Sequence, residues 1–449
     1  MKRVGGARFD LGRVVILGAG ETGMAAAHLV SRLGARAWVA DDHRDLRADR
    51  QLAAVAEPLT ARDAAGCVDL ATLVIPSPGV PSSHPLLQRA QAAGVEIVSE
   101  IEFAAAMIGR PVLAVTGTNG KSTTVTLLAM ILEEAGYRVF SGGNLGPPLS
   151  DGVGAEVDYF VVEVSSFQLE WARGFRPATA VLLNIGDDHA DRHGAPEAYA
   201  AVKLGLLANL DAGARAVVGR DGDCYRQARA CSPAALSSFG FSPLDPGCRG
   251  MLADRASMTL SDGEGWRATI KGEAFFVPHT LANLAAAAEV ARGEGVDVGP
   301  VERAAARFKP LNHRLQLVAK AGGVEFWNDS KATNVAATLS SLEAFDRPVV
   351  VLLGGTAKGA DLSPLAAAAC KIKAAVVFGQ ARQELREVLA GRTTVCEAGC
   401  FDDAFRRALE AASTGDVVLL APACASWDEF GGYAERGRRF VELVEEVRV

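Results

Sequence analysis

Short apolar runs alternate with alanine-rich stretches along the chain, and the first series of runs lies within the first hundred residues. These runs occupy residues 13–17, 36–40, 73–75 and 95–98. Short continuous apolar runs separated by helical stretches are typical of parallel strands that have helices on both faces of their sheet. The pattern therefore predicts a parallel sheet covered by helices.

Two further series of apolar runs follow. The second contains residues 111–115, 159–164 and 179–184, and the third contains residues 323–327, 347–353, 374–378 and 416–420. A new strand directly after a predicted helix at 100–108 indicates a domain boundary near residue 105. Between about 240 and 275, glycine, serine and aspartate are frequent and alternation is weak, which predicts hairpins on the rim of the central domain.

The three series predict an α/β fold of three domains. The domains are a Rossmann-like N-terminal domain at 1–104, a central domain with a P-loop ATPase-like parallel sheet at 105–310, and a Rossmann-like C-terminal domain at 311–449. A chain of 449 residues is longer than one hydrophobic core usually organises, so its length agrees with several domains.

Composition narrows the possible partners. A formal net charge of -7 gives no basic footprint for a nucleic-acid backbone, so we expect no nucleic-acid partner. The eight cysteines are scattered without a second pair that would complete a zinc site, which favours reduced thiols. The apolar stretch Val14–Ala19 is too short for a signal peptide, and no run approaches a membrane span. We therefore expect a cytoplasmic protein, monomeric and without a membrane partner.

The segment Val115–Thr123 carries the strongest chemical signal. It follows a predicted strand and reads V-T-G-T-N-G-K-S-T. Backbone N–H groups of the glycine turn and the start of the following helix favour a phosphate, the lysine adds a positive charge, and the serine hydroxyl can bind magnesium. This phosphate loop predicts an ATP site formed by Gly117, Thr118, Asn119, Gly120, Lys121, Ser122 and Thr123.

A second glycine turn, Gly18–Gly23, follows the first strand and opens a helix, and Asp41 ends the next strand. This spacing matches the dinucleotide-binding fingerprint, so a nicotinamide-dependent dehydrogenase is one reading of the first domain. An anion such as the diphosphate of a UDP-sugar is equally favourable at the N-terminus of the helix.

Two strand ends near the phosphate loop carry candidate metal ligands. Glu163 ends the strand at 159–164, where a carboxylate can hold a magnesium ion that bridges phosphates, although it could also pair with an arginine. His189 follows the strand at 179–184 among carboxylates, which suits a second metal or an orienting network. A core histidine held by Asp188 is the alternative.

Four segments together resemble the Mur ligases of peptidoglycan synthesis, and the resemblance covers essentially the whole chain. They are the phosphate loop, Glu163–Gln168, Asn184–Arg192 and Asn328–Asn334, and the ending Pro422–Asp428 with Arg436 and Gly437 also fits. The resemblance implies an ATP-dependent amide ligase that joins glutamate to UDP-N-acetylmuramoyl-L-alanine through an acyl phosphate. D-glutamate is the expected amino acid, and L-glutamate remains the alternative.

The resemblance also implies roles for individual residues. It implies two Mg²⁺ sites held by Ser122, Glu163, His189 and a carbamoylated Lys203, although Lys203 alone would be taken for a surface lysine. The ATP base and ribose are implied to contact Asn283, Arg314 and Asp329. The UDP substrate is implied to contact Gly20, Thr22, Asp41, Ser77, Gly79 and Asn144. The amino acid is implied to contact Lys331, Thr333, Lys358, Ser426, Trp427 and Tyr433.

Three positions depart from the family pattern. Ala357 stands where an aspartate is common, Asn312 where a proline is common, and Thr280 where an asparagine is common. None of these removes an expected phosphate or metal ligand, but Ala357 precedes Lys358 in the predicted amino-acid site.

Overall fold

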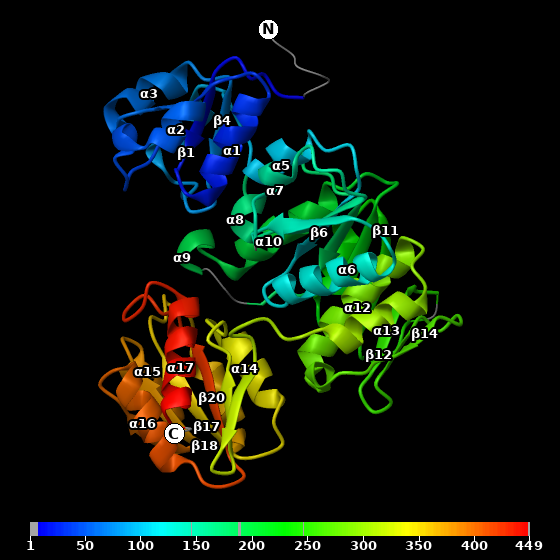
Figure 1. The fold of residues 1–449 in the computed structure, drawn as a ribbon, viewed down its shortest axis with the longest axis vertical. Coiled ribbons are helices and arrows are strands. Elements are labelled where there is room, and N and C mark those ends of the chain that lie inside the picture. Colours follow the sequence, from blue (N-terminus) through cyan, green and yellow to red (C-terminus); the bar gives the residue numbers. More distant parts are fainter. Residues whose placement is uncertain (1–7, 145, 187–189, 246, 448–449) are drawn as a thin grey trace. The chain divides into compact units, whose positions relative to one another are not determined.

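A computed structural model describes residues 8–144, 146–186, 190–245 and 247–447. The chain contains three sheets, which confirms the predicted α/β class. It forms two compact units: residues 1–185, 200–272 and 280–307 make up the first, and 186–199, 273–279 and 308–449 the second. The first unit carries two of the sheets and the second unit carries the third (Figure 1).

The N-terminal sheet has five parallel strands in the order β3-β2-β1-β4-β5. Along β1, Val14 and Ile16 pack into one hydrophobic core and Val15 and Leu17 into another, because successive side chains of a strand point to opposite faces. The strand order reverses on either side of β1, and ligands of such sheets bind at this point, beyond the carboxyl ends of the strands. The strands are β1 Val14–Leu17, β2 Ala37–Ala40, β3 Ala56–Pro58, β4 Leu73–Pro76 and β5 Glu96–Ile97, and the helices are α1 Glu21–Arg32, η1 Leu46–Ala48, α2 Arg50–Val55, α3 Ala61–Asp69, α4 Pro85–Ala92 and α5 Glu100–Ala105.

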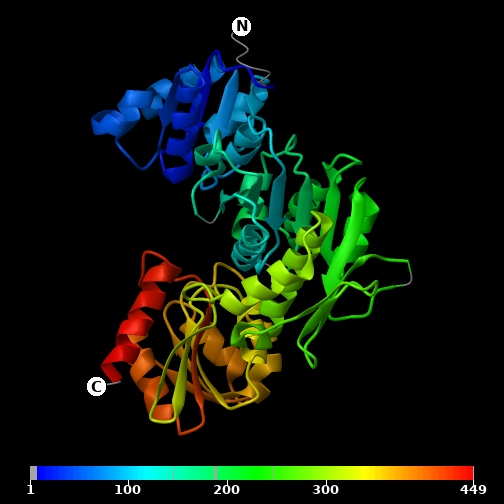
Figure 2. The same cartoon turned by 45° about the vertical axis from the view of Figure 1, so that its right-hand side comes forward.

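The central sheet has nine strands in the order β14-β13-β12-β11-β10-β9-β6-β8-β7 (Figure 2). Strand β6 lies between β8 and β9, and all pairs from β7 to β12 are parallel. Strands β12, β13 and β14 are antiparallel at one edge, which confirms the hairpins predicted between 240 and 275. The strands are β6 Val112–Thr116, β7 Val139–Gly143, β8 Tyr159–Glu163, β9 Thr179–Leu182, β10 Arg215–Gly219, β11 Ala235–Gly240, β12 Gly250–Asp254, β13 Thr259–Ser261 and β14 Arg267–Thr269. The helices are α6 Lys121–Glu134, α7 Leu149–Gly152, α8 Ser166–Leu169, α9 Ala190–His193, α10 Pro196–Ala208, α11 Cys224–Cys231, η2 Glu273–Phe276, α12 Pro278–Gly293 and α13 Val298–Arg307.

The third sheet has six strands in the order β15-β16-β20-β17-β18-β19, and only the β15–β16 pair is antiparallel. Helices α14 and α15 contribute to the hydrophobic core on one face, and α16 and α17 to the core on the other. The elements are β15 Gln316–Ala321, β16 Val324–Asn328, α14 Val335–Glu343, β17 Val349–Gly354, η3 Ser363–Lys371, β18 Ile372–Phe378, α15 Arg382–Leu389, β19 Thr394–Glu397, α16 Phe401–Ala411, β20 Val417–Ala423 and α17 Tyr433–Val447.

A buried carboxyl lies where α5 meets α7 within the first unit. Glu100 is 2% exposed, and its Oε1 accepts a hydrogen bond from the Ser150 N–H at 2.6 Å. Its Oε2 is buried without a hydrogen-bond partner in the described part of the chain. Burial raises the pKa of Glu100 to about 7, and the nearby Asp151 adds to this, whereas Ser150 opposes it. Folding therefore shifts Glu100 toward its protonated form.

Glu100→Gln is expected to increase the free energy of unfolding at pH 8. Because the folded pKa of Glu100 lies above its unfolded value, wild-type stability falls as pH rises from about 4.5 to about 7 and stays reduced above that. A neutral glutamine removes this loss, which amounts to at most roughly 3 kcal/mol. Urea unfolding at pH 5 and pH 8 measures the effect, with the exposed Glu96→Gln as the control. A gain of equal size at both pH values would contradict the assignment.

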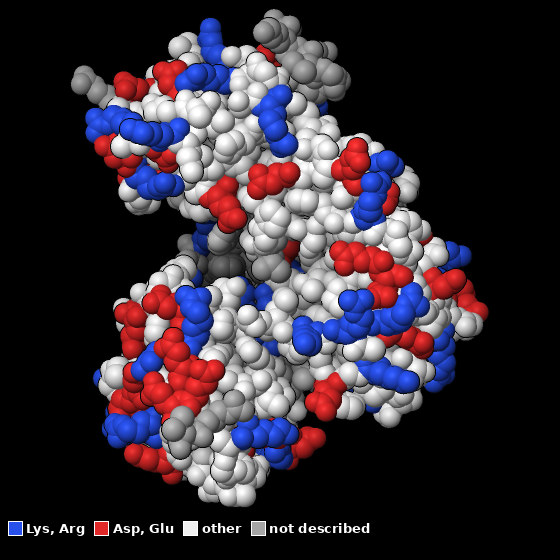
Figure 3. Space-filling view, viewed as in Figure 1, with Lys and Arg blue, Asp and Glu red and all other residues white. Residues whose placement is uncertain are grey.

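The surface and the cysteines agree with the composition. On the face drawn in Figure 3, lysine and arginine side chains are interspersed with aspartate and glutamate rather than gathered into one basic area. The structure pairs none of the eight cysteines in a disulfide. Among the described residues, no helix combines the length and the hydrophobicity that crossing a bilayer requires.

Candidate functional site

The phosphate loop joins β6 to α6 as predicted. Gly117 and Gly120 have φ angles of +153° and +88°, which side chains rarely adopt. The Lys121 ammonium donates to the carbonyls of Gly117 and Thr118 at 2.8 and 2.9 Å, so it lies over the loop. Ser122 is buried in the first turn of α6, where the backbone N–H groups and the helix dipole favour an anion.

Asn184 holds this loop in shape. Its carbonyl oxygen accepts from the Thr118 N–H at 3.0 Å, and its side-chain Oδ1 accepts from the Asn119 N–H at 2.9 Å. Its Nδ2 donates back to the Asn119 carbonyl at 3.1 Å. Asn184 begins one of the segments that resemble the family, but the sequence alone assigned it no role. The signal was available, because Asn184 follows β9, the strand beside β6.

Lys203 lies within the same site and not on the surface. It belongs to α10, is 1% exposed, and its Nζ donates to the Gly117 carbonyl at 3.0 Å. The reading of Lys203 as a surface lysine is therefore wrong. A buried amine within hydrogen-bond reach of the phosphate loop is placed to act on bound phosphates or on their metal ion.

Glu163 provides a carboxylate next to the loop. Strand β8 pairs with β6 so that Glu163 is the register partner of Val115. Its Oε1 accepts from the Asn144 Nδ2 at 2.7 Å, whereas Oε2 is buried without a hydrogen-bond partner among the described residues. A buried carboxylate oxygen left unpaired is costly unless a cation completes it.

The residues present fit a magnesium ion. Mg²⁺ is usually held by one or two carboxylates together with waters and substrate phosphates. The described residues contain no group of three or more histidine, cysteine or acidic side chains that could hold a metal. The unpaired oxygen of Glu163 with the hydroxyl of Ser122 is a donor set of the kind that Mg²⁺ uses beside phosphates. The predicted ligand His189 lies outside the described residues.

Asn283 closes the other side of the phosphate loop. It is a buried residue of α12, and a Cβ atom placed on Gly120 would lie 2.3 Å from its Oδ1. The structure therefore brings this predicted nucleotide-binding residue against the loop, and the close approach requires glycine at position 120.

Gly120→Ala is expected to raise the KM for ATP about tenfold or more. The methyl group would displace Asn283, and the positive φ alone costs about 1–2 kcal/mol for alanine. Gly136→Ala is the matched control, because Gly136 has a φ of +92° with nothing within 4 Å of an added Cβ. Steady-state kinetics with varied ATP measure the change. Equal KM values for the two variants would show that contact with Asn283 is unimportant.

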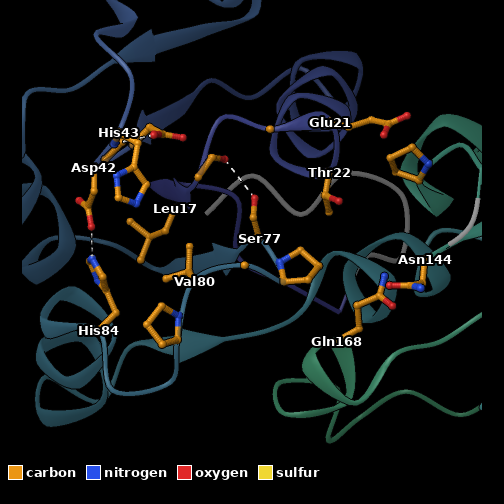
Figure 4. A pocket seen from close by; sticks show the side chains of 18 of the residues that line it. Leu17, Glu21, Thr22, Asp42, His43, Ser77, Val80, His84, Asn144 and Gln168 are labelled. Atoms are coloured by element: carbon orange, nitrogen blue, oxygen red, sulfur yellow. Dashed lines mark hydrogen bonds and ion pairs between the residues drawn. The ribbon is translucent and has the colours of Figure 1, made fainter. Parts of the chain in front are cut away.

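A cavity of about 520 Å³ lies at the carboxyl ends of β1 and β4. All six predicted UDP-substrate residues line it: Gly20, Thr22, Asp41, Ser77, Gly79 and Asn144. In Figure 4, Asp42, His43 and His84 lie at one end, Ser77 lies centrally, and Thr22, Asn144 and Gln168 lie toward the other end. Asn144 also binds Glu163, so this second end of the cavity adjoins the predicted metal ligand.

The glycine turn at the cavity is tightly packed. A Cβ on Gly23 would lie 1.9 Å from the Gly18 carbonyl, and the Ser77 hydroxyl donates to the same carbonyl at 3.1 Å. Gly20 precedes α1 and its side-chain-free backbone opens the helix N-terminus to the cavity. The turn therefore presents the positive end of a helix to an anionic group.

Asp41 is held by backbone donors. Its oxygens accept from the N–H groups of Ala19 at 2.7 Å, His43 at 2.9 Å and Arg44 at 3.0 Å. Burial raises the pKa of Asp41, but these hydrogen bonds outweigh it, so the pKa lies below its usual value. Asp41 thus shapes the rim of the cavity as an anion.

A histidine–aspartate pair that was not predicted from the sequence lies at the cavity. The His84 Nε2 lies 2.8 Å from the Asp42 Oδ2, and the His84 Nδ1 accepts from the Leu86 N–H at 3.2 Å (Figure 4). The second contact caps α4. Because the two partners come from different strand ends, no local pattern in the sequence indicated the pair.

The remaining predicted nucleotide contacts belong to the second unit. Asp329 is buried, and its carboxylate accepts a hydrogen bond from Ser341. Burial raises the pKa of Asp329 to about 6, while Ser341, the Leu315 N–H and Arg314 oppose the rise. Arg314 therefore lies near Asp329, and a role for both in binding ATP stays a prediction.

The predicted amino-acid residues lie in loops that follow strands of the third sheet, except for Tyr433, which begins α17. The Lys331 Nζ lies 3.9 Å from the centre of the Tyr433 ring, and the Lys358 Nζ lies 3.6 Å from the centre of the Trp427 ring. Thr333 follows Lys331 in the same loop, and its N–H donates to the Lys331 carbonyl at 2.8 Å. The buried Ser426 immediately precedes Trp427.

Arg436 connects the loops that follow β16, β17 and β20 by hydrogen bonds, a role that was not predicted from the sequence. Its guanidinium is fully buried and donates to the carbonyls of Ser330 at 3.1 Å, Cys424 at 3.1 Å and Gly354 at 3.2 Å. Burial lowers the pKa of Arg436 to about 10. The loops that begin at Ser330, Gly354 and Cys424 carry Lys331, Lys358 and Trp427, so one cation fixes their relative positions.

A parallel sheet with a lysine-bearing phosphate loop, a strand-end carboxylate beside it and a separate substrate cavity defines a nucleotide-dependent enzyme of the P-loop class. Three family models match the chain: "Mur ligase MurD-like, N-terminal domain" at residues 12–99, "Mur ligase middle domain" at 115–290 and "Mur ligase, glutamate ligase domain" at 313–424. The chain belongs to the Mur ligase family.

Curated relatives match over almost the full length. The UDP-N-acetylmuramoylalanine--D-glutamate ligase of Syntrophus aciditrophicus is 36% identical, with 96% of this chain and 97% of the relative covered. The enzyme of the same name from Myxococcus xanthus is 37% identical, with 96% and 98% covered. Among solved structures, the MurF ligase of Thermotoga maritima in complex with ADP has a TM-score of 0.62 at 18% identity, with 100% of this chain and 99% of that chain covered, and it supports the fold alone.

Proposed function

We propose that this protein is an ATP-dependent amide ligase that joins D-glutamate to UDP-N-acetylmuramoyl-L-alanine in peptidoglycan precursor synthesis. Full-length relatives that carry this activity in their names support the proposal. The observation that carries the proposal is that the cavity and the phosphate loop are connected within the first unit. Asn144 lines the substrate cavity and binds Glu163, and Glu163 lies on the strand beside the phosphate loop.

The cavity gives the substrate a direction. In this proposal the diphosphate binds at the N-terminus of α1 near Gly20 and Ser77, and the nucleoside binds toward Asp42 and His84, all of which line the cavity. The muramoyl-alanine end then points toward Asn144, where its carboxylate can meet the γ-phosphate of ATP. A nicotinamide dehydrogenase is disfavoured, because the first domain matches the Mur ligase model and the second carries the phosphate loop.

The reaction has two chemical steps. The substrate carboxylate attacks the γ-phosphate and forms an acyl phosphate with release of ADP, and the amine of glutamate then displaces phosphate to form the amide. Magnesium held by Glu163 and Ser122 would neutralise charge on the transferred phosphoryl group. Lys121 adds a positive charge at the same place, and the enzyme otherwise acts by aligning the reactants.

The other site assignments are part of the same proposal. In this proposal Lys203 is carbamoylated and would hold a second magnesium ion together with His189, and Asn283, Arg314 and Asp329 would contact the nucleotide. The domains at 1–104, 105–310 and 311–449 bind the UDP substrate, ATP and the amino acid, respectively. The use of ATP as a substrate and the cysteines without disulfide partners agree with a cytoplasmic location.

Phosphate release with ATP and UDP-N-acetylmuramoyl-L-alanine, measured against a panel of D- and L-amino acids, tests the proposal. D-glutamate is expected to stimulate release and to form the amide product. If no amino acid stimulates release, the ligase assignment fails. Stimulation by L-glutamate alone would overturn only the stereochemical part.

A further inference from the structure

The ammonium of Lys358 lies over an exposed indole ring. Its Nζ is 3.6 Å from the centre of the Trp427 ring, and Trp427 is 65% exposed. A large aromatic side chain with so much surface in solvent contributes little to the hydrophobic core. Folding therefore does not explain why a tryptophan stands here, and its ring contacts a lysine that is predicted to bind a glutamate carboxylate.

Backbone hydrogen bonds and a close approach connect the two loops that carry Lys358 and Trp427. Thr356 and Ala425 exchange two hydrogen bonds at 2.8 and 3.0 Å, which ties the two loops together two residues before Lys358 and Trp427. A Cβ on Gly355 would lie 2.0 Å from the Ala425 carbonyl, so the loops touch closely. Lys358 itself has a φ of +53°, a conformation that costs energy for a residue other than glycine.

No carboxylate of the described part of the chain holds the Lys358 ammonium, because Lys358 forms no ion pair within 4.0 Å there. The preceding residue is the uncharged Ala357. The nearest acidic residue in the Trp427 loop, Asp428, accepts from the Gln380 N–H at 3.0 Å and from the Glu429 N–H at 3.2 Å. The ring face of Trp427 is thus the feature of the described structure that holds the ammonium.

We propose that Trp427 is a positioning residue for the amino-acid substrate. Its indole face holds the Lys358 ammonium in the position where the ammonium can receive a carboxylate of glutamate. This inference rests on the proposed function. An aromatic face attracts a cation without neutralising it. A carboxylate partner would instead form an ion pair that the substrate has to break. The indole therefore fixes the direction of the lysine and leaves its charge for the incoming acid.

Trp427→Leu and Trp427→Phe test the proposal as a matched pair. Leucine removes the ring, and we expect the KM for D-glutamate to rise about three- to tenfold. Phenylalanine keeps an aromatic face, so its KM for D-glutamate is expected to lie between those of wild type and Trp427→Leu. The KM values for ATP and for the UDP substrate are expected to stay within about twofold of wild type in both variants. The melting temperatures are expected to be unchanged, because the side chain is exposed.

A second readout does not depend on turnover. The fluorescence of Trp427 is expected to change when D-glutamate binds in the presence of the UDP substrate and a non-hydrolysable ATP analogue, because the carboxylate that pairs with the ammonium changes the electric field at the ring over which the ammonium stays. Trp427→Phe is expected to lose this change. The inference is overturned if wild type uses D-glutamate but Trp427→Leu has the same KM for it, or if all three KM values rise together. Absence of any glutamate-dependent product in wild type would instead contradict the proposed function.

Discussion

Glu163→Gln is expected to lower kcat for phosphate release by about 100-fold or more. The Oε2 of Glu163 is buried without a hydrogen-bond partner among the described residues, next to the predicted phosphate loop. Glutamine keeps the shape and can still accept from Asn144 through its oxygen, but it places an N–H₂ group or a neutral oxygen where the magnesium ion needs an anion. Loss of one preorganised charge at a phosphoryl-transfer site typically costs several kcal/mol of transition-state stabilisation.

Magnesium titration distinguishes a ligand from a structural residue. The variant is expected to need a much higher Mg²⁺ concentration for half-maximal activity, with an unchanged melting temperature in the absence of metal. Glu156→Gln is the control, because Glu156 precedes the same strand and its side chain is 94% exposed. Wild-type activity and an unchanged Mg²⁺ requirement in Glu163→Gln would remove Glu163 from the metal site.

The sequence was sufficient to predict this part of the site because the signals are local. A glycine turn with a lysine between a strand and a helix implies its own geometry, and Glu163 ends a neighbouring apolar run. Parallel strands present their carboxyl ends at the same edge of a sheet, so the two features had to meet. The strand order β9-β6-β8 confirms this inference. The predicted UDP-substrate residues follow the same logic, since they lie beyond the ends of β2, β4 and β7 or at the start of α1.

Other features depend on contacts between segments that are distant in sequence. The burial of Lys203 results from packing of α10 against the phosphate loop, 86 residues earlier in the chain. The hydrogen bonds of Arg436 reach back 82 and 106 residues to Gly354 and Ser330. Neither side chain has a periodic or compositional signature, because any helix can carry a lysine or an arginine. Sequence patterns define the strand ends, but they do not identify which helix side chains pack against them.

Some strands were also missed for a physical reason. Strand β7 contains a serine and two glycines and is only partly buried, so it lacks the apolar run on which the prediction was based. Gly143 is required at its end, because an added Cβ would lie 2.3 Å from the Glu163 carbonyl. This close approach brings Asn144 to Glu163, so the weakest strand signal belongs to the segment that connects the cavity to the predicted metal ligand.

Lys203→Ala is expected to lose most of the ligase activity and to regain part of it with short carboxylic acids. In the structure the Lys203 Nζ donates to the Gly117 carbonyl. When a neutral lysine amine adds to carbon dioxide, a carbamate forms and a proton is released. The carbamate nitrogen keeps one hydrogen, so the contact with Gly117 can persist while the new carboxylate reaches toward the phosphates. An anion there would bind magnesium, whereas an ammonium would repel it.

A carbamate and an ammonium at Lys203 predict that different additives restore the activity of Lys203→Ala. If Lys203 acts as a carbamate, acetate or formate is expected to restore part of the activity of Lys203→Ala, and methylammonium is expected to have no effect. If it acts as a plain cation that holds the loop, methylammonium would restore activity and acetate would not, and the carbamate would be rejected. Lys271→Ala, at an exposed position, controls for loss of a positive charge elsewhere. Full activity of Lys203→Ala without additives would exclude both roles, because a residue buried at 1% exposure against the phosphate loop would then be needed only for packing.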